Sequence, residues 1–362
     1  MSASPSPSGS SALHHSGFAT DRIQRMELAA GLYQIAFSAR LNAVFVASTG
    51  GFGGTASPSR VYRLSSSTLE IQAEIALPAK GFSLALDDAA ARLYVGNTLD
   101  CSVTLIDVDA AKIVTTVQLA EATINADGKP SYPHHVRELL LDPTTRRLYA
   151  PGVSMKDSAL YVIDTERLAV ATTLPGLGYA ATGIALGADN QQLLICNMQG
   201  QLITIDPDTL SITRAIETGG DQLLNLALDP ANGRIFVTDQ GHEALASMWS
   251  RDLPDYRQRG SGNQVLVLSS TDGTELARIP TGAGPIDLLL DPTDQRLFVT
   301  NRGGKSLTVF DSTSYALLET IALPGYPNSL AYDAANRVLF VTLKVDETAP
   351  AGSLDSVVRI AF

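Results

Sequence analysis

The sequence predicts an all-β fold, a seven-bladed β-propeller, from three observations. An aromatic or apolar residue within a short "RLYV"-like strand recurs seven times. A turn position lies seven residues before each recurrence, and each repeat unit divides into four short strands. The recurring residues are Phe45, Tyr94, Tyr149, Leu194, Phe236, Phe298 and Phe340. Units of about 40 to 50 residues with four strands each are typical of propeller blades.

The turn positions are the most uniform part of the repeat. They are Ser38, Asp87, Asp142, Gly187, Asp229, Asp291 and Asp333, and three of the aspartates are followed by proline. Aspartate can bond to the neighbouring backbone, and proline presets its own φ, so this pair favours a tight turn. We therefore expect a short turn between the first two strands of every blade, here called strands A and B.

The sixth repeat shows the four-strand pattern most plainly. Its predicted strands cover 286–290, 296–300, 306–311 and 316–323, and they are rich in β-branched, aromatic and alternating apolar residues. Such composition and alternation favour strands over helices. We name the four strands A, B, C and D in chain order.

The two ends of the chain predict how the ring closes. The seventh repeat stops after its third strand, while "RIQRMELAAG" at 22–31 aligns with strand D of the fourth repeat, "SITRAIETGG" at 211–220. We therefore expect the N-terminal strand to complete the last blade, which removes a free sheet edge. The predicted domain covers 21–362. Residues 1–20 are rich in Ser and Pro and are predicted to be a disordered leader without the features of a signal peptide.

The composition restricts the classes of function. The 362 residues include 26 basic and 37 acidic side chains, a net charge of −11, which opposes generic binding of nucleic acid or anionic membranes. A local basic patch can still override that average. Two cysteines are too few for a disulfide framework, and no run of about 20 apolar residues predicts a membrane span. Common haem and zinc motifs are absent, and we expect no cofactor.

Several strings carry a family resemblance over residues 21–362. "FVTN" at 298–301, "YVGN" at 94–97 and "FVTD" at 236–239 resemble the YVTN family of propeller repeats. "ATGIAL" (181–186), "GQLITIDPDTL" (200–210), "YPNSLA" (326–331) and "VVRIAF" (357–362) resemble the bacterial YncE-type propellers. That resemblance implies export to the periplasm and no assigned reaction, with one member described as binding single-stranded DNA. The fold is also shared with quinoprotein amine dehydrogenase subunits and lactonases.

The long connections predict which face of the ring carries function. The extra residues fall in B–C loops at 48–60, 151–159, 240–263 and 344–355, and in one D–A connection at 120–136. In a four-stranded antiparallel blade these connections all lie at one end. Long loops on a rigid scaffold are where binding functions are usually found.

The longest of these connections has an unusual composition. The 240–263 loop holds the only tryptophan, Trp249, with Tyr256 and the arginines Arg251 and Arg257. Aromatic and arginine side chains together are typical of interface hot spots and of base-stacking surfaces. The alternative interpretation is that Trp249 packs over the top of a blade while the arginines are solvated.

A second candidate site lies where strand A begins. Six of the seven residues four positions before the turn are polar: Gln34, Ser83, Glu138, Asn225, Asp287 and Ser329, with Gly183 as the exception. Buried polar groups need partners, so these residues predict a hydrated central channel that ties the inner strands together. Alternatively, Glu138 and Asp287 bind a cation or act as acid and base.

Further polar residues are expected around the mouth of that channel. They are Arg137, Arg302, Lys344, Tyr326 and Asn328, with Asn97, Asn197, Asp239 and Asn301 at the ends of B strands forming an outer ring.

Histidines suggest a metal site as a further hypothesis. His134, His135 and His242 fall in the elaborated loops, where imidazoles with a carboxylate could ligate a divalent transition metal. Adjacent residues point opposite ways in an extended chain, which favours the alternative of hydrogen-bonded or solvated loop histidines.

The sequence thus favours a non-enzymatic, periplasmic binding propeller, expected to be a monomer, that uses Trp249, Arg251, Tyr256, Arg257, Arg137, Glu138, Asp287, Arg302 and Asn328 on the elaborated face. A cytoplasmic location is the alternative if the chain is not exported. Single-stranded DNA binding, a lactonase-like hydrolysis with Glu138, Asp287 or His135, and metal binding are the competing functions.

Overall fold

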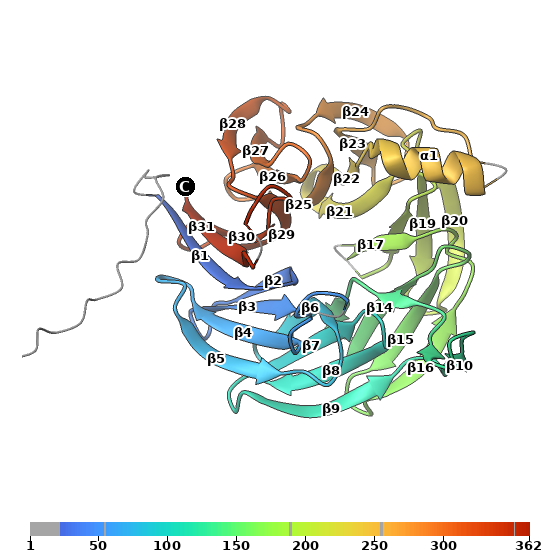
Figure 1. Ribbon diagram of the computed structural model, residues 1–362. Helices are drawn as coiled ribbons and strands as arrows, with labels where there is room; N and C mark the ends of the chain where they lie inside the picture. Colours follow the sequence, from blue (N-terminus) through green and yellow to red (C-terminus); the bar gives the residue numbers. More distant parts are fainter. Residues whose placement is uncertain (1–21, 54–55, 188–189, 254–255, 351) are drawn as a thin grey trace, which may run out of the picture.

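The computed structural model describes residues 22–53, 56–187, 190–253, 256–350 and 352–362, and within these it forms seven antiparallel sheets arranged around an axis (Figure 1). The predicted seven-bladed β-propeller is therefore confirmed. The predicted leader, 1–20, lies outside the described residues. None of the described helices is long and apolar enough to cross a membrane.

The first four blades follow the chain in order. Blade 1 consists of β2 (Leu32–Ser38), β3 (Ala43–Ser48), β4 (Arg60–Ser65) and β5 (Ile71–Ala76). Blade 2 consists of β6 (Gly81–Asp87), β7 (Arg92–Asn97), β8 (Ser102–Asp107) and β9 (Lys112–Gln118). Blade 3 has a split strand A, β12 (His135–Val136) and β13 (Leu140–Asp142), followed by β14 (Arg147–Val153), β15 (Ala159–Asp164) and β16 (Ala169–Leu174). Blade 4 consists of β17 (Ala181–Leu186), β18 (Leu193–Asn197), β19 (Gln201–Asp206) and β20 (Ser211–Glu217).

The last three blades complete the ring. Blade 5 consists of β21 (Leu223–Asp229), β22 (Arg234–Asp239), β23 (Gln264–Ser269) and β24 (Glu275–Pro280). Blade 6 consists of β25 (Pro285–Asp291), β26 (Arg296–Asn301), β27 (Ser306–Asp311) and β28 (Leu317–Ala322). Blade 7 combines β29 (Tyr326–Asp333), β30 (Val338–Lys344) and β31 (Asp355–Ala361) with the N-terminal β1 (Ile23–Ala29), so the predicted ring closure is confirmed.

The recurring residue of strand B explains why the sequence repeats. Each of the seven lies in a different apolar cluster, and each cluster joins its own blade to the next one around the ring. Phe298 of blade 6, for example, packs with Leu330 and Leu339 of blade 7. Phe340 of blade 7 packs with Leu32 of blade 1, which closes the series. The repeat therefore encodes the contacts between blades, and burial of these large side chains stabilises the ring.

The predicted A–B turns are confirmed by their hydrogen bonds. The side chain of Asp142 accepts a hydrogen bond from the backbone N–H of Thr144 (3.0 Å), and Asp291 accepts one from Thr293 in the same way (3.0 Å). This is the local bond that favours aspartate at turns.

A bulge near the start of strand A recurs in six blades and positions the channel residues. The pairing of strands A and B shifts there in blades 1, 2, 4, 5, 6 and 7. In blade 7 the hydroxyl of Thr342 accepts a hydrogen bond from the N–H of Ser329 (3.1 Å) and donates one to the carbonyl of Tyr33 in blade 1 (2.7 Å). The hydroxyl groups of Thr238 and Thr300 accept the equivalent backbone N–H hydrogen bond in blades 5 and 6. The threonine of the "FVT" strings is thus a structural residue.

Replacing that threonine tests its role. We expect Thr342→Val to lower the free energy of unfolding by about 1–3 kcal/mol, because it leaves the bulge N–H of Ser329 without its acceptor. Thr320→Val, on the exposed outer strand β28, serves as the control and should change stability by less than about 0.5 kcal/mol. Urea denaturation of both variants measures the difference; equal midpoints would contradict this role.

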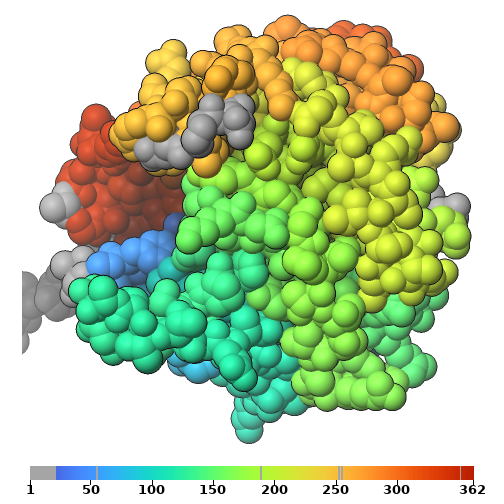
Figure 2. All heavy atoms as spheres, turned by 90° about the vertical axis from the view of Figure 1, so that its right-hand side faces the viewer, coloured from blue at the N-terminus to red at the C-terminus, as the bar shows by residue number. Residues whose placement is uncertain are grey.

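Two of the long connections contain regular structure that was not predicted. The 240–263 segment forms the helix α1 (Glu243–Asp252), where the sequence predicted only a loop. The D–A connection at 120–136 contains the small hairpin β10 (Thr123–Ile124) and β11 (Pro130–Ser131). Blade 5 also contains the 3-10 helix η1 (Pro230–Asn232) in its A–B turn. In the side view, the gold residues of the α1 segment and the red residues of blade 7 lie along the same side of the molecule (Figure 2).

Candidate binding site at the mouth of the channel

Strand A of every blade begins at the face that carries the long loops, so its first residues surround the axis at that end. Below the first residues lies a cavity of about 220 Å³, here called the axial cavity. It is lined by Gln34, Ile35, Leu84, Glu138, Ile184, Asn225, Leu226, Asp287, Ser329 and Leu330. Five of the seven positions expected to line a channel are among them. Ser83 and Gly183 are not, and the next residues, Leu84 and Ile184, take their places.

The polar residues of the axial cavity bind the inner strands to one another. Gln34 donates a hydrogen bond to the carboxyl group of Glu138 (2.6 Å) and accepts one from the N–H of Leu84 (2.6 Å), which links blades 1, 2 and 3. On the other side, Asp287 accepts hydrogen bonds from Asn225 (3.3 Å) and from the N–H of Leu330 (2.9 Å), which links blades 5, 6 and 7. Both carboxyl groups therefore have structural partners.

The two carboxyl groups also have unusual acidities. Removal from bulk water raises the pKa of Glu138 to about 8, and the negative charge of Asp287 adds to that rise. The same desolvation raises the pKa of Asp287 to about 6, although backbone N–H groups oppose it. At pH 7 the axial cavity therefore holds a mostly protonated Glu138 and a mostly ionised Asp287.

Aromatic and cationic side chains gather beside the axial cavity; Tyr33, Phe82 and Arg137 lie one residue before a channel position of strand A, and Lys344 ends strand B of blade 7. The rings of Tyr33 and Phe82 stack with centroids 3.8 Å apart. The guanidinium group of Arg137 lies 5.4 Å from the centroid of Phe82, and the Lys344 ammonium lies 3.5 Å from that of Tyr33. Such cation–π contacts hold positive charge at an apolar surface.

The blade 6 and blade 7 side of the mouth has the same character. Arg302 lies 5.8 Å from the ring centroid of Tyr326 and donates a hydrogen bond to the side-chain oxygen of Asn328 (3.1 Å). Phe52, half-exposed in the B–C loop of blade 1, meets Tyr33 edge-on with centroids 6.3 Å apart. We call these eight residues the mouth cluster: Tyr33, Phe52, Phe82, Arg137, Arg302, Tyr326, Asn328 and Lys344.

Positive charge dominates the mouth cluster despite the net charge of the chain. Burial raises the pKa of the Tyr33 hydroxyl, while the charges of Arg137 and Arg302 lower it, so both guanidinium groups act on this one ring. Lys344 is also close, and its ion pair with Asp355 (3.2 Å) supplies the negative charge at this point. Burial lowers the pKa of Lys344 to about 8, which leaves it mostly charged at pH 7. Among the residues that the structure describes, neither Arg137 nor Arg302 forms an ion pair with a carboxylate.

The residues of the 240–263 segment are not part of the mouth cluster, and the burial of Trp249 differs from the expectation. Trp249 is only 1% exposed, so the structure corrects the prediction that its side chain offers contact area on the surface. Its ring packs with Val153 and Tyr179 from blade 3 and the connection to blade 4, because α1 folds back over these blades. Tyr256 is half-buried and donates a hydrogen bond to Asp221 (2.5 Å). Arg251 and Arg257 are exposed.

The outer ring of B-strand residues is also buried. Asn97, Asn197 and Asn301 are 0% exposed and Asp239 is 1% exposed, so they do not surround the mouth as expected. Asn301, for example, donates hydrogen bonds to Ser306 (3.3 Å) and Thr308 (3.1 Å) within its own blade. The asparagine of the repeat therefore fastens the end of strand B to strand C.

The histidines do not assemble a metal site in the described part of the chain. No group of three or more His, Cys, Asp or Glu side chains that could hold a metal ion occurs among the described residues. His134 hydrogen-bonds with the hydroxyl of Tyr161 (2.6 Å), and His242 caps the N-terminus of α1. Burial and the neighbouring Arg137 lower the pKa of His135, which does not line the axial cavity.

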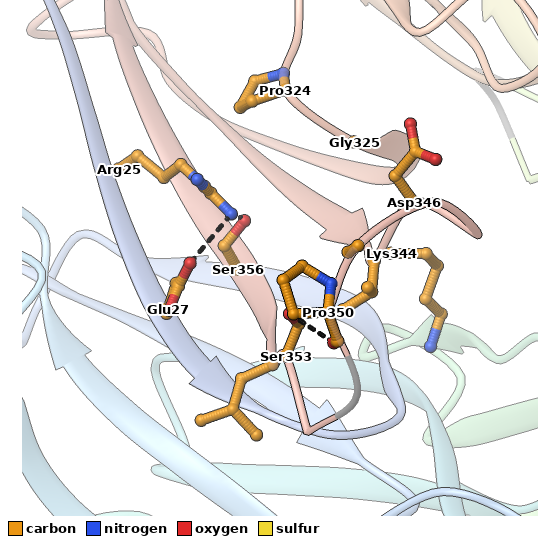
Figure 3. A pocket seen from close by; sticks show the side chains of 12 residues that line it. Arg25, Glu27, Pro324, Gly325, Lys344, Asp346, Pro350, Ser353 and Ser356 are labelled. Atoms are coloured by element: carbon orange, nitrogen blue, oxygen red, sulfur yellow. Dashed lines mark hydrogen bonds and ion pairs between the residues drawn. The ribbon is translucent and has the colours of Figure 1, made fainter. Parts of the chain in front are cut away.

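A second cavity of about 220 Å³ lies beside blade 7 (Figure 3). Its polar wall includes an ion pair between Arg25 and Glu27 (3.3 Å), and Arg25 also donates a hydrogen bond to Ser356 (3.0 Å). The ammonium end of Lys344 points away from Arg25 and Glu27, and it lies over Tyr33 in the mouth cluster (Figure 3). Each charged group of this second cavity thus has a partner: Arg25 pairs with Glu27 inside it, while Asp346 pairs with Lys305 and Lys344 with Asp355, which do not line it.

Sequence reasoning found the cations of the mouth cluster but missed Tyr33, Phe82 and Phe52. A usable signal was present, because Tyr33, Phe82 and Arg137 each stand immediately before a predicted channel residue. Tyr33 and Phe82 are residue types that are equally common in the core of a strand.

The fold and the mouth define a β-propeller whose elaborated face carries a cationic and aromatic opening above a polar axial cavity. The chain is 32% identical over 357 residues to a protein described as "Uncharacterized protein YncE" from Salmonella typhimurium, covering 96% of this chain and 93% of the relative. It is 29% identical over 356 residues to the protein of the same description from Escherichia coli K12, covering 95% and 92%. The chain belongs to the YncE family.

Two further comparisons concern protein-family models and solved structures. No protein-family model matches the chain. Among solved structures, Kuenenia stuttgartiensis hydrazine synthase superposes with a TM-score of 0.70 at 16% identity, covering 91% of this chain and 95% of that one. At that identity the likeness shows the fold alone.

Proposed function

We propose that this chain is a binding propeller that takes an anionic ligand in its mouth cluster. One observation carries the proposal: Arg137, Arg302 and Lys344 converge around Tyr33, with Asp355 as the close counter-charge. The two guanidinium groups lie at aromatic faces and have no ion pair among the described residues, so an incoming carboxylate or phosphate can pair with them. Guanidinium is well suited to such two-pronged recognition.

The net charge of −11 does not oppose this binding at contact distance. At physiological salt, charges separated by more than about 8 Å are largely screened, so the cations that touch the ligand outweigh acidic residues spread over the outer surface. The distant charges mainly slow the approach of a polyanion.

Exposed apolar side chains on the same loops favour a binding face. Phe52, Leu99, Ile124, Met155 and Leu354 are each 39–70% exposed, and all belong to B–C or D–A connections. Exposed apolar groups around a polar site are common where a ligand or partner docks.

Single-stranded nucleic acid is the second candidate ligand. The observation that favours it is the alternation of aromatic rings with cations in the mouth cluster, since bases stack on such rings while phosphates pair with arginine and lysine. The net charge opposes it at long range.

A ligand titration with matched variants tests the proposal. We expect Arg302→Gln and Arg137→Gln each to weaken binding of the tightest anion in a panel of phosphate, dicarboxylates, an acidic peptide and a short oligonucleotide. The expected loss is about tenfold to a hundredfold per arginine, as for a charge-assisted hydrogen bond. Arg167→Gln is the control, because Arg167 is exposed in a C–D turn at the opposite end of the ring.

Two results would contradict the proposal. The first is binding by both mouth variants with the affinity of the wild-type protein. The second is failure of every anion in the panel to bind the folded wild-type protein at low salt. A preference for the oligonucleotide within the panel would select the second candidate.

The other predicted properties stay proposals. We propose a periplasmic location, which fractionation of the source bacterium tests, and a monomer, which sedimentation tests. The lactonase-like alternative, with Glu138 and Asp287 as acid and base, is tested by turnover of a panel of lactones and its loss in Glu138→Gln.

A further inference from the structure

The mouth cluster and the axial cavity have opposite chemistry although they are adjacent. Arg137 directly precedes Glu138, Asn328 precedes Ser329, and Tyr33 precedes Gln34, while Ile286 precedes Asp287. One residue along a strand advances about 3.3 Å, so the backbone of Arg137 in the mouth cluster lies within a few ångströms of the backbone of Glu138 in the axial cavity, and Asn328 stands in the same relation to Ser329. A single small molecule can therefore touch both.

The axial cavity by itself favours positive charge. Its lining includes the carboxyl groups of Glu138 and Asp287, which are close enough to influence each other, and no lysine, arginine or histidine. The amide groups of Gln34 and Asn225 and the hydroxyl of Ser329 complete its polar wall. The remaining lining is aliphatic and suits a short methylene chain.

Both carboxyl groups are held in place by hydrogen bonds from the protein. The backbone N–H groups of Leu288 (2.9 Å) and Leu330 (2.9 Å) fix Asp287, and Gln34 fixes Glu138. A group that enters the axial cavity thus meets oxygens that are already oriented, which lowers the entropic cost of binding.

We propose, on the basis of the proposed function, that the ligand is a small zwitterion. Its carboxylate group binds Arg137 and Arg302 in the mouth cluster, and its ammonium group enters the axial cavity against Asp287 and Glu138. An anion without the ammonium group uses only the upper half of this site. A polyanion cannot place negative charge in the axial cavity.

The decisive comparison uses matched probes on the full chain. The zwitterions are the ω-amino acids from 3-aminopropanoate to 6-aminohexanoate, and the controls are the amine-free carboxylates of the same lengths, butylamine, and calcium chloride alone. Calorimetry at pH 7 and low salt should give at least tenfold tighter binding for one or two zwitterions of optimal length than for their amine-free counterparts. This is the gain expected of one added charge-assisted interaction.

Variants then locate the ammonium group. In Asp287→Asn the ratio of the zwitterion affinity to the amine-free affinity should fall toward one, and in Glu138→Gln it should fall less, because Glu138 is mostly protonated at pH 7. Circular dichroism confirms that both variants are folded. Arg167→Gln should retain the wild-type ratio.

The outcomes separate this inference from the proposed function. Equal affinities for amine-free and zwitterionic probes would overturn the zwitterion and leave anion binding intact. Tight binding of calcium or butylamine alone, lost in Asp287→Asn, with no gain from a carboxylate on the same molecule, would also overturn it and assign a simple cation site. Failure of all carboxylates and zwitterions to bind, with some other anion of the panel bound, overturns the zwitterion alone.

Discussion

Removal of residues 1–30 should leave a protein that does not close its ring and that loses most of its stability. β1 is the outer strand of blade 7 and pairs with β31 from Ile23↔Ile360 to Glu27↔Ser356. Met26, Leu28 and Ala29 also pack on the apolar cluster that joins blades 7 and 1. Losing these contacts should cost about 3–6 kcal/mol on the scale of buried apolar side chains, a large part of the 5–15 kcal/mol that stabilises a typical domain.

Removal of residues 1–21 alone is the matched control, because it leaves β1 intact. Thermal and urea denaturation of the two truncated proteins give the comparison. The shorter chain should unfold at markedly lower urea concentration and should aggregate, since β31 becomes an unpaired edge. Coincident unfolding curves for the two truncations would refute closure by β1.

The second large effect is a pH-dependent gain of stability in Glu138→Gln. The pKa of Glu138 is raised to about 8 from an ordinary 4.5, so between these values the folded protein holds a proton that the unfolded chain has released. The contribution of the Glu138 carboxyl group to the free energy of unfolding of the wild-type protein therefore falls as pH rises from 4.5 to 8. Glutamine does not titrate, and its amide can still bond with Gln34.

Unfolding free energies should diverge accordingly. The variant should match or fall slightly below the wild-type protein near pH 4.5 and should exceed it by about 2–3 kcal/mol at pH 8.5, allowing for partial access of cavity water to the carboxyl group. Urea denaturation at five pH values measures this. Glu121→Gln, exposed in the D–A connection, is the control and should give a difference independent of pH. A flat difference for Glu138→Gln would show that its carboxyl is ionised without penalty.

The fold could be predicted because the repeat is enforced by packing. The seven recurring residues each fill one contact between neighbouring blades, so their spacing carries the number of blades directly. The closing strand could be predicted because the seventh repeat stops after its third strand and residues 22–31 align with strand D of the fourth repeat. The polar ring of strand A followed from the same alignment.

The details of the elaborated face could not be predicted in the same way. Trp249 combines with Tyr179 and Val153, which lie about 70 and 95 residues earlier, and no repeat constrains such contacts. A single loop helix with a histidine N-cap also leaves little periodic signal. Aromatic residues such as Tyr33 and Phe82 are equally suited to a strand core, and only the structure shows their stacking at the mouth.

The salt dependence of anion binding tests most directly whether the mouth cluster is the binding site. The affinity for the tightest anion from the panel is measured against salt concentration for the wild-type protein and for the double variant Arg137→Gln/Arg302→Gln. We expect the wild-type affinity to fall steeply as salt rises from 50 to 200 mM (about fourfold in concentration), and the double variant to bind at least a hundredfold more weakly with a shallower salt dependence. The same affinity and the same salt dependence in both proteins would show that the anion binds elsewhere.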